Sequence, residues 1–232
     1  MGNFVLIGGS YGIGFQLAQQ LLEEGNTVHI YARTIGKLVE SENLIFHTHN
    51  VMEDKLDPLQ ITNKIDGLVY LPGSIQLKPF HRISKQDFLD DFHINFLGAV
   101  DSIQAFLPQL KEAKGSIVLI SSIAATTGMP FHTSISAAKG AIEGFAKSLA
   151  AELAPNVRVN VVAPSLTDTP LAERFLSSPE KKDASSKRHP LGRVGKAEDI
   201  AEAISYLLSP KSSWVSGQVL HIDGGMSSLK TT

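Results

Sequence analysis

The sequence predicts a single α/β domain over residues 1–232, built on a doubly wound parallel sheet of seven strands with helices on both faces. Three observations predict this class. Short runs of β-branched and aliphatic residues alternate along the chain with amphipathic stretches. Several runs are apolar at consecutive positions, as in strands that are covered on both faces. The repeated strand–helix order implies right-handed crossovers between parallel strands.

The expected strands are short and the expected helices are longer. We expect strands at Phe4–Ile7, Thr27–Tyr31, Leu44–His47, Gly67–Leu71, Ser116–Ile120, Val157–Val162 and Gln218–Ile222. Apolar residues at helical spacing predict helices at Ile13–Glu24, Lys85–Leu110, Ile135–Leu153 and Ala197–Leu208. The most polar tract, residues 177–189, is too short to separate two domains. We interpret it as a surface loop that could act as a lid over a substrate.

Composition excludes several classes of protein. The formal net charge of −2 creates no field that would attract nucleic acid or an anionic membrane. The absence of cysteine excludes disulfides, thiolate catalysis and cysteine-bound metal, and we expect no metal site. No apolar stretch approaches the roughly 20 residues that span a bilayer, and no targeting segment is visible at the N-terminus. We therefore expect a cytoplasmic protein with no nucleic-acid or membrane partner.

A glycine-rich loop, residues 8–14 (GGSYGIG), joins the first expected strand to the first expected helix. Glycine in such a loop permits positive φ, close approach of a pyrophosphate and tight packing of the helix on the strand. The N–H groups at the start of the helix attract phosphate. The loop therefore predicts a dinucleotide site that includes Gly8, Ser10, Tyr11, Gly12, Ile13 and Gly14.

The end of the second expected strand indicates which dinucleotide is bound. An acidic side chain there would bind the ribose 2′-hydroxyl of NAD, but the sequence continues with Ala32, Arg33 and Thr34. A guanidinium pairs with a 2′-phosphate, so NADP(H) is favoured over NAD(H), with Arg33 and Thr34 as contacts. A solvated Arg33 in a surface turn is the alternative.

At this point the chain resembles the short-chain dehydrogenase/reductase family over essentially its whole length. Gly8, Gly12 and Gly14 match the family's Gly-x-x-x-Gly-x-Gly loop. Residues 116–122 (SIVLISS) and 158–164 (RVNVVAP) match its fifth and sixth strands, and 218–225 (QVLHIDGG) match its closing segment. The resemblance implies a Rossmann-type fold and an oxidoreductase that uses a nicotinamide dinucleotide on a small molecule.

The resemblance also implies roles for individual residues. Ser122 falls on the catalytic serine, Asn95 on the active-site asparagine, and Lys139 on the catalytic lysine, which also bonds the nicotinamide ribose. The remaining cofactor contacts that it implies are Asn50, Val51, Pro72, Gly73, Pro164, Thr167 and Thr169. The chain departs from the family pattern after the sixth strand, where Pro-Gly is replaced by Pro164-Ser165.

The most informative departure is Ile135, which stands four positions before Lys139, in the place of the family's proton-exchanging tyrosine. Isoleucine offers no proton, and loss of a general acid typically costs about 10²–10⁴ in rate. His132 is one substitute, while Ser134 and Ser136 are expected to point elsewhere, one of them capping the helix. Alternatively the substrate needs no tyrosine, as when a conjugated C=C bond is reduced and water or another acid protonates carbon.

Two functions follow from this pattern. The first is an NADP(H)-dependent oxidoreductase that acts on a small carbonyl or conjugated-alkene substrate, in a pocket lined by residues 124–133 and 171–189. The second is a catalytically silent dinucleotide-binding sensor or partner protein. The family commonly forms dimers or tetramers through the helices that carry Asn95 and Lys139, which implies a homodimer or homotetramer. Burial within one monomer would explain the same apolar stripes on these helices.

Overall fold

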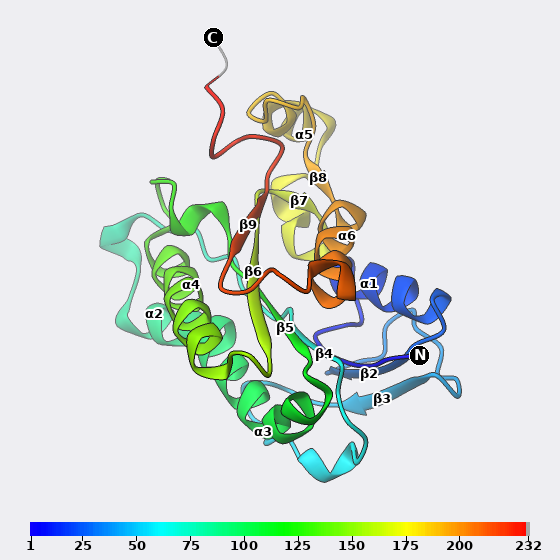
Figure 1. Ribbon diagram of the computed structural model, residues 1–232. Coiled ribbons are helices and arrows are strands. Elements are labelled where there is room, and N and C mark those ends of the chain that lie inside the picture. Colours follow the sequence, from blue (N-terminus) through cyan, green and yellow to red (C-terminus); the bar gives the residue numbers. More distant parts are fainter. Residues whose placement is uncertain (231–232) are drawn as a thin grey trace.

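Seven parallel strands form the central sheet in the order β3-β2-β1-β4-β5-β6-β9 (Figure 1). The computed structural model describes residues 1–230. The chain runs outward from β1 to β3 and then returns to place β4 on the other side of β1, which is the doubly wound order. The predicted fold class is confirmed. The strands are β1 (Asn3–Ile7), β2 (Thr27–Ala32), β3 (Leu44–Thr48), β4 (Gly67–Tyr70), β5 (Ser116–Ile120), β6 (Arg158–Pro164) and β9 (Val219–Ile222).

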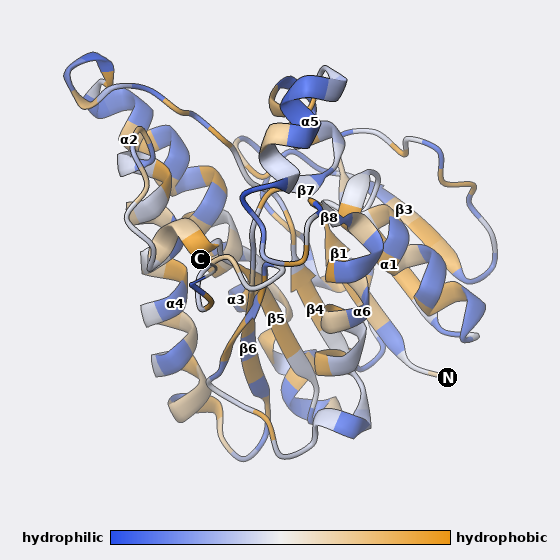
Figure 2. Ribbon diagram, turned by 90° about the horizontal axis from the view of Figure 1, so that it is seen from above, coloured by the Kyte–Doolittle hydropathy of each residue, from blue (hydrophilic) through white to orange (hydrophobic). Residues whose placement is uncertain are grey.

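Helices cover both faces of this sheet. They are α1 (Gly12–Glu23), α2 (Lys85–Phe92), α3 (Gly98–Ala113), α4 (Thr133–Leu153), α5 (Pro179–Ser186) and α6 (Ala197–Leu208). In β1 the side chains alternate, so that Val5 and Ile7 join a core cluster with α3 and α4, whereas Leu6 joins a second cluster with α1 and α6. Figure 2 shows the apolar strands lying between helices whose outer sides are more polar.

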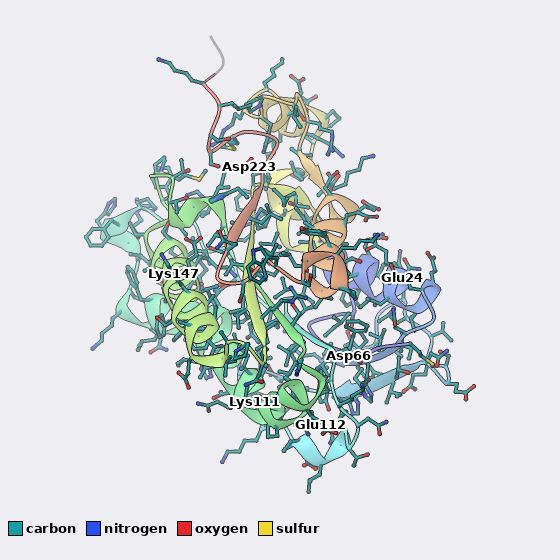
Figure 3. All side chains as sticks on the ribbon, viewed as in Figure 1. Glu24, Asp66, Lys111, Glu112, Lys147 and Asp223 are labelled. Carbon is teal, nitrogen blue, oxygen red and sulfur yellow. The ribbon has the colours of Figure 1, made fainter. Side chains whose placement is uncertain are left out.

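Charged side chains lie on the outside of these layers. Glu24 after α1, Lys111 and Glu112 on α3, and Lys147 on α4 are all exposed (Figure 3). The apolar stripe of α3, which includes Ile103 and Phe106, is buried in the core of one chain. The stripe is therefore explained by the fold of the monomer and gives no support to an oligomer. Within residues 1–230 no helix is both long and apolar enough to cross a membrane.

The structure divides the helix that was predicted at Lys85–Leu110. A π-helical turn at His93–Leu97 separates α2 from α3. A π turn adds one residue to a helical turn, and the spacing of apolar residues is too coarse to show such an insertion. The turn matters for function because it contains Asn95, whose side-chain amide donates to the main-chain oxygen of Asp91 at 2.8 Å.

The prediction of a loop over residues 177–189 was wrong, because helix α5 occupies most of this tract. Ser178 accepts a hydrogen bond from the N–H of Lys181, and Pro179 and Glu180 occupy the first turn. Serine followed by proline and an acidic residue is a helix start signal that the polar composition obscured. With the short strands β7 (Thr167–Asp168) and β8 (Gly195–Lys196), α5 lies beyond the carboxyl ends of the main strands (Figure 1).

Candidate active site

The glycine loop between β1 and α1 has a backbone that side chains would disturb. Gly8 and Gly12 have φ angles of 85° and 54°, in the left-handed region that favours glycine. A Cβ atom on Gly14 would lie 2.5 Å from the main-chain oxygen of Gly8, closer than real Cβ contacts. Three of the predicted loop positions therefore require glycine, and the loop stays tightly folded against the start of α1.

The same loop fits a phosphate-bearing ligand. Ser10 is buried, and its hydroxyl oxygen has no hydrogen-bond partner within residues 1–230. An orphaned buried hydroxyl is rare in proteins and indicates a missing partner. Thr169, from the segment after β6, lies against the loop, because a Cβ on Gly12 would be 3.2 Å from the Cβ of Thr169. Together with the N-terminus of α1, these groups suit a pyrophosphate.

The residues predicted for the adenosine half follow the same edge of the sheet. Arg33 and Thr34 are exposed after β2, and the Thr34 hydroxyl lies 3.5 Å from the hydroxyl of Tyr11. Asn50 accepts a hydrogen bond from the N–H of Met52 at 3.2 Å and so closes the turn after β3. The remaining predicted contacts on this side are Val51, which packs on the core, and Pro72, which lies against Gly8.

A cavity of about 330 Å³ opens at the carboxyl ends of β4, β5 and β6. Position at this edge is where open α/β sheets bind their ligands. The predicted site residues that line it are Ile13, Gly73, Asn95, Ser122, Lys139, Pro164, Thr167 and Thr169. The two segments expected to form a substrate pocket contribute Ala124, Met129, His132, Leu171, Ala172, Phe175, Ser185, Arg188 and His189. The fold thus brings the proposed catalytic and nicotinamide-side residues around one space.

Lys139 reaches this cavity from α4 and is 7% exposed. Its Nζ donates a hydrogen bond to the main-chain oxygen of Ile120 at 2.8 Å. Burial lowers the pKa of Lys139 from 10.5 to about 8, and the negative charge of Asp91 partly opposes this shift. Lys139 therefore remains largely protonated near neutral pH. Ser122, also on the cavity wall, accepts a hydrogen bond from the N–H of Ala124 at 3.2 Å.

Asn95 is held in place by the loop after β4. Its amide nitrogen donates to the hydroxyl of Ser74 at 2.9 Å, and its amide oxygen accepts from the N–H of Ser74 at 3.4 Å. With its bond to the main chain of Asp91, the side chain has partners on two segments. The expectation that Asn95 would hold backbone near Lys139 agrees with this arrangement.

Asp91 is a buried carboxylate that the sequence analysis missed. It is 1% exposed and accepts hydrogen bonds from the hydroxyls of Ser74 and Ser134, the latter at 2.6 Å. An acidic residue on an amphipathic helix is usually on the solvated face, so its type gave no signal. The expected capping role of Ser134 or Ser136 was wrong, because Ser134 bonds Asp91 and Ser136 bonds the main-chain oxygen of Ala124.

A second missed feature is a pair of polar side chains on the cavity wall. The hydroxyl of Ser165 lies 2.9 Å from Nε2 of His189, and both residues line the cavity. Ser165 follows β6, and His189 follows α5. The substitution of Ser165 for the family's glycine was visible in the sequence. Its partner was not, because the two residues are 24 positions apart.

Ile135 also lines the cavity, next to these polar groups, and is 4% exposed. None of the chain's four tyrosines, all of them within the described residues, reaches the cavity wall. Tyr70 is the nearest in sequence to a wall segment, but it is buried in the core and donates to the main-chain oxygen of Ile94 at 2.7 Å. Burial raises the pKa of Tyr70 above its usual range, which makes it a poorer acid.

Comparison with known proteins identifies the family. A family model described as Enoyl-(Acyl carrier protein) reductase matches residues 47–227. The 3-oxoacyl-(acyl-carrier-protein) reductase FabG of Thermotoga maritima is 33% identical over 245 residues, which cover 96% of each chain. The peroxisomal 2,4-dienoyl-CoA reductase SPS19 of Saccharomyces cerevisiae is 38% identical over 211 residues, or 86% of this chain and 72% of that protein.

Solved structures agree with these relatives. A short chain dehydrogenase family protein from Francisella tularensis superposes with a TM-score of 0.90 at 28% identity, over 99% of this chain and 100% of that one. ElxO with bound NADP superposes with a TM-score of 0.87 at 30% identity, over the same shares. Sequence, fold and site geometry lead to one conclusion: the chain belongs to the short-chain dehydrogenase/reductase family and is an oxidoreductase that uses a nicotinamide dinucleotide.

Proposed function

We propose that this protein is an NADP(H)-dependent reductase of small substrates with a conjugated C=C bond. One observation carries the proposal: Ile135 replaces the tyrosine acid, while Ser122, Asn95 and Lys139 stay together on the wall of the same cavity. A site that had lost its use would not be expected to keep a buried lysine, because an interior ammonium without a role is costly.

The chemistry of the two substrate classes explains this combination. Reduction of a ketone needs a proton on oxygen, which the family's tyrosine supplies. Reduction of a conjugated alkene places negative charge on the carbonyl oxygen but finally puts the proton on carbon. A bound nicotinamide supplies the hydride in either case. The Ser122 hydroxyl and the charged Lys139 would stabilise the developing oxyanion without needing to protonate it.

The lining of the cavity supports an apolar substrate. Much of the wall is aliphatic or aromatic, namely Leu71, Ile75, Leu77, Ile123, Ile135, Leu166 and Phe175. Two comparisons point the same way in their names, since the matching family model is that of an enoyl reductase and one relative is a 2,4-dienoyl-CoA reductase. Relatives named 3-oxoacyl reductases act on a carbonyl, so the proposal rests on Ile135 rather than on relatedness alone.

The preference for NADP(H) rests on Arg33. This guanidinium is exposed after β2 and makes no salt bridge with any residue of the described chain. It is therefore available to a 2′-phosphate, which it can bind through two parallel hydrogen bonds. ElxO, at 30% identity, was solved with NADP and with NADPH.

Titration of the purified protein with NADPH and NADH tests the cofactor. We expect NADPH to bind more tightly, and Arg33→Ala to weaken NADPH by at least about tenfold while NADH changes little, since one charge-assisted contact is worth about 1.5–3 kcal/mol. Equal effects on both cofactors would show that Arg33 does not read the 2′-phosphate. Binding of neither would overturn the oxidoreductase proposal.

Turnover of enones and ketones by the wild type and Ile135→Tyr tests the reaction. We expect the wild type to oxidise NADPH with enones but not with ketones. Ile135→Tyr should lower enone reduction by filling the pocket and should raise ketone reduction. Tight NADPH binding without turnover of either class would favour the silent sensor instead. A gain in ketone reduction with no enone activity in the wild type would identify a disabled carbonyl reductase.

We also propose a homodimer or homotetramer, on the family's habit. Trp214 is 99% exposed in the segment before the edge strand β9, where an apolar contact between copies would cover it. Light scattering coupled to size-exclusion chromatography measures the mass directly, and a mass near the 25.0 kDa of one chain would overturn this expectation.

A further inference from the structure

The cavity has a second polar centre besides Ser122, Asn95 and Lys139. We propose that Ser165 and His189 form the proton-transfer pair that takes over from the missing tyrosine, with Ser165 as the group that protonates substrate carbon. This inference rests on the function proposed above. The Ser165 hydroxyl lies 2.9 Å from Nε2 of His189, and both side chains are on the cavity wall.

The surroundings of His189 determine which nitrogen carries a hydrogen. Nδ1 lies 2.8 Å from the main-chain oxygen of Ser185. A carbonyl oxygen can only accept, so Nδ1 must hold a hydrogen and Nε2 is directed at Ser165. His189 is 4% exposed, which shows that it is built into the site rather than solvated. A serine, a histidine and an orienting third group form the arrangement that activates hydroxyls elsewhere.

The backbone of Ser165 is fixed as well. Its N–H donates to the main-chain oxygen of Ile222 in β9, and its carbonyl accepts from the Thr167 hydroxyl at 3.1 Å. Ser165 is therefore anchored on both sides of its side chain. A general acid must be held at a set position relative to the reacting atom, and this anchoring provides it.

The same hydrogen bond serves both protonation states of His189. With a neutral imidazole, the Ser165 hydroxyl donates to Nε2. With an imidazolium, Nε2–H donates to Ser165, and the Ser165 hydrogen is released for the substrate. Arg188, the nearest charged neighbour along the chain, also lines the cavity. The pair can therefore hold a proton beside the substrate and pass it on.

The proton balance of the reaction is complete. The hydride of the reduced dinucleotide adds to the β-carbon, and the C=C electron pair shifts to give an enolate whose oxygen faces Ser122 and Lys139. The enolate α-carbon takes the hydrogen of Ser165, and Ser165 takes the Nε2 hydrogen of His189. Neutral His189 then regains a proton from solvent. The products are the saturated carbonyl compound and the oxidised dinucleotide.

Two departures from the family pattern therefore complement each other. The phenol four residues before Lys139 is lost, and a hydroxyl is gained where the family has glycine after the sixth strand. The two polar centres come from different elements, one from β5, the π turn and α4, the other from the segments after β6 and α5. Conjugate reduction needs such a division, because the oxyanion and the protonated carbon are separate atoms.

His132 is the competing donor on the cavity wall. Its Nδ1 lies 2.7 Å from the main-chain oxygen of Pro130, and no hydroxyl is paired with its ring within the described chain. It is also more exposed than His189. Ser165–His189 is therefore the better-organised donor, and the two can be separated by experiment.

The test compares Ser165→Gly, which installs the family's residue, with Ser165→Thr, which keeps a hydroxyl, and His189→Gln. His81→Gln, an exposed histidine outside the cavity, is the control. The probe is 2-methylcyclohex-2-enone with NADPH in D₂O, because protonation of its α-carbon creates a labelled stereocentre. We expect Ser165→Gly and His189→Gln to lower kcat by about 10²-fold or more, with NADPH affinity unchanged. Ser165→Thr should recover part of the loss.

The configuration of the product separates catalysis from structure. The wild type and His81→Gln should deliver deuterium to one face of the α-carbon, whereas Ser165→Gly should give a mixture, because water then protonates the enolate from either side. Nitrogen-15 spectra of the free protein provide a readout without turnover: Nδ1 of His189 should be protonated, and the Nε2 signal should move in Ser165→Gly.

Contrary results would be distinct. Unchanged rate and configuration in Ser165→Gly would overturn the pair while leaving the proposed function intact. The same holds if His132→Gln, rather than Ser165→Gly, abolishes the configuration. If the wild type binds NADPH but reduces no enone, the proposed function itself fails.

Discussion

Lys139 carries a buried positive charge, and the pH dependence of stability should reveal it. Its pKa is lowered by burial from 10.5 to about 8. Between these values the unfolded chain binds a proton that the folded chain lacks, so the free energy of unfolding must rise with pH. The slope is about 1.4 kcal/mol per pH unit. Below the folded-state pKa, Lys139 is charged in both states and the full penalty of burial is present.

Replacement of Lys139 by Met removes this titration and keeps an unbranched side chain. We expect the wild type to gain about 2 kcal/mol relative to Lys139→Met between about pH 7 and about pH 9.5, which is the part of the slope above the folded-state pKa. Loss of the bond to the Ile120 oxygen shifts stability at both pH values alike, so it cancels. Other groups that titrate in this range do so in both proteins and cancel too.

Urea unfolding at the two pH values measures this double difference. The free energy extrapolated to water carries an uncertainty of about 10–15%, so a difference of this size is measurable. A wild type that gains less than about 0.5 kcal/mol over Lys139→Met would refute the argument. It would show that water reaches the ammonium, and that the contacts of Lys139 do not hold a desolvated charge at the cavity wall.

Further predictions concern the groups around this lysine and the glycine loop. Asp91→Asn removes the charge that favours protonated Lys139, so the alkaline fall in enone reduction should begin about one pH unit lower; an unchanged rate profile would separate the two groups. Gly14→Ala would press a Cβ against the main chain of Gly8, and NADPH affinity by calorimetry should fall at least about tenfold. Gly140→Ala on α4 meets nothing within 4 Å, and it should keep that affinity and gain up to about 1 kcal/mol in stability. Equal affinity in the two variants would contradict the role of Gly14.

Much of the fold was predictable because its signals are local. Each of the seven strands is a short apolar run, and the structure has all seven within two residues of the expected ends. Helix α6 occurs at Ala197–Leu208 as expected, since its buried residues repeat at helical spacing. Such signals depend on the burial of one face, which composition along the chain already records.

The misses arose where local chemistry competed with composition. The helix start at Ser178 and Pro179 was outweighed by the charged residues that follow it. The π turn at His93–Leu97 inserts a residue without changing the apolar pattern on either side. In both cases the backbone follows a capping or bonding preference of a few residues, which an average over a longer window does not detect.

The candidate site divides in the same way. The dinucleotide half depends on backbone shape, and shape leaves a record in the sequence, because Gly8, Gly12 and Gly14 stand where side chains would collide or strain the loop. The catalytic half depends on side chains from separate elements. There the sequence shows what is missing, since a family pattern predicts tyrosine at position 135, but it does not show what replaces it.

A replacement can be recognised only when the chain is folded. Ser165 and His189 become neighbours because α5 follows β6 and brings the chain back over the carboxyl edge of the sheet. Asp91 becomes a counter-charge to Lys139 because α2 packs on α4. Neither pairing follows from residue type or spacing. A catalytic group that is lost at one position of this fold can therefore be supplied from another element, provided that the second element reaches the same edge of the sheet.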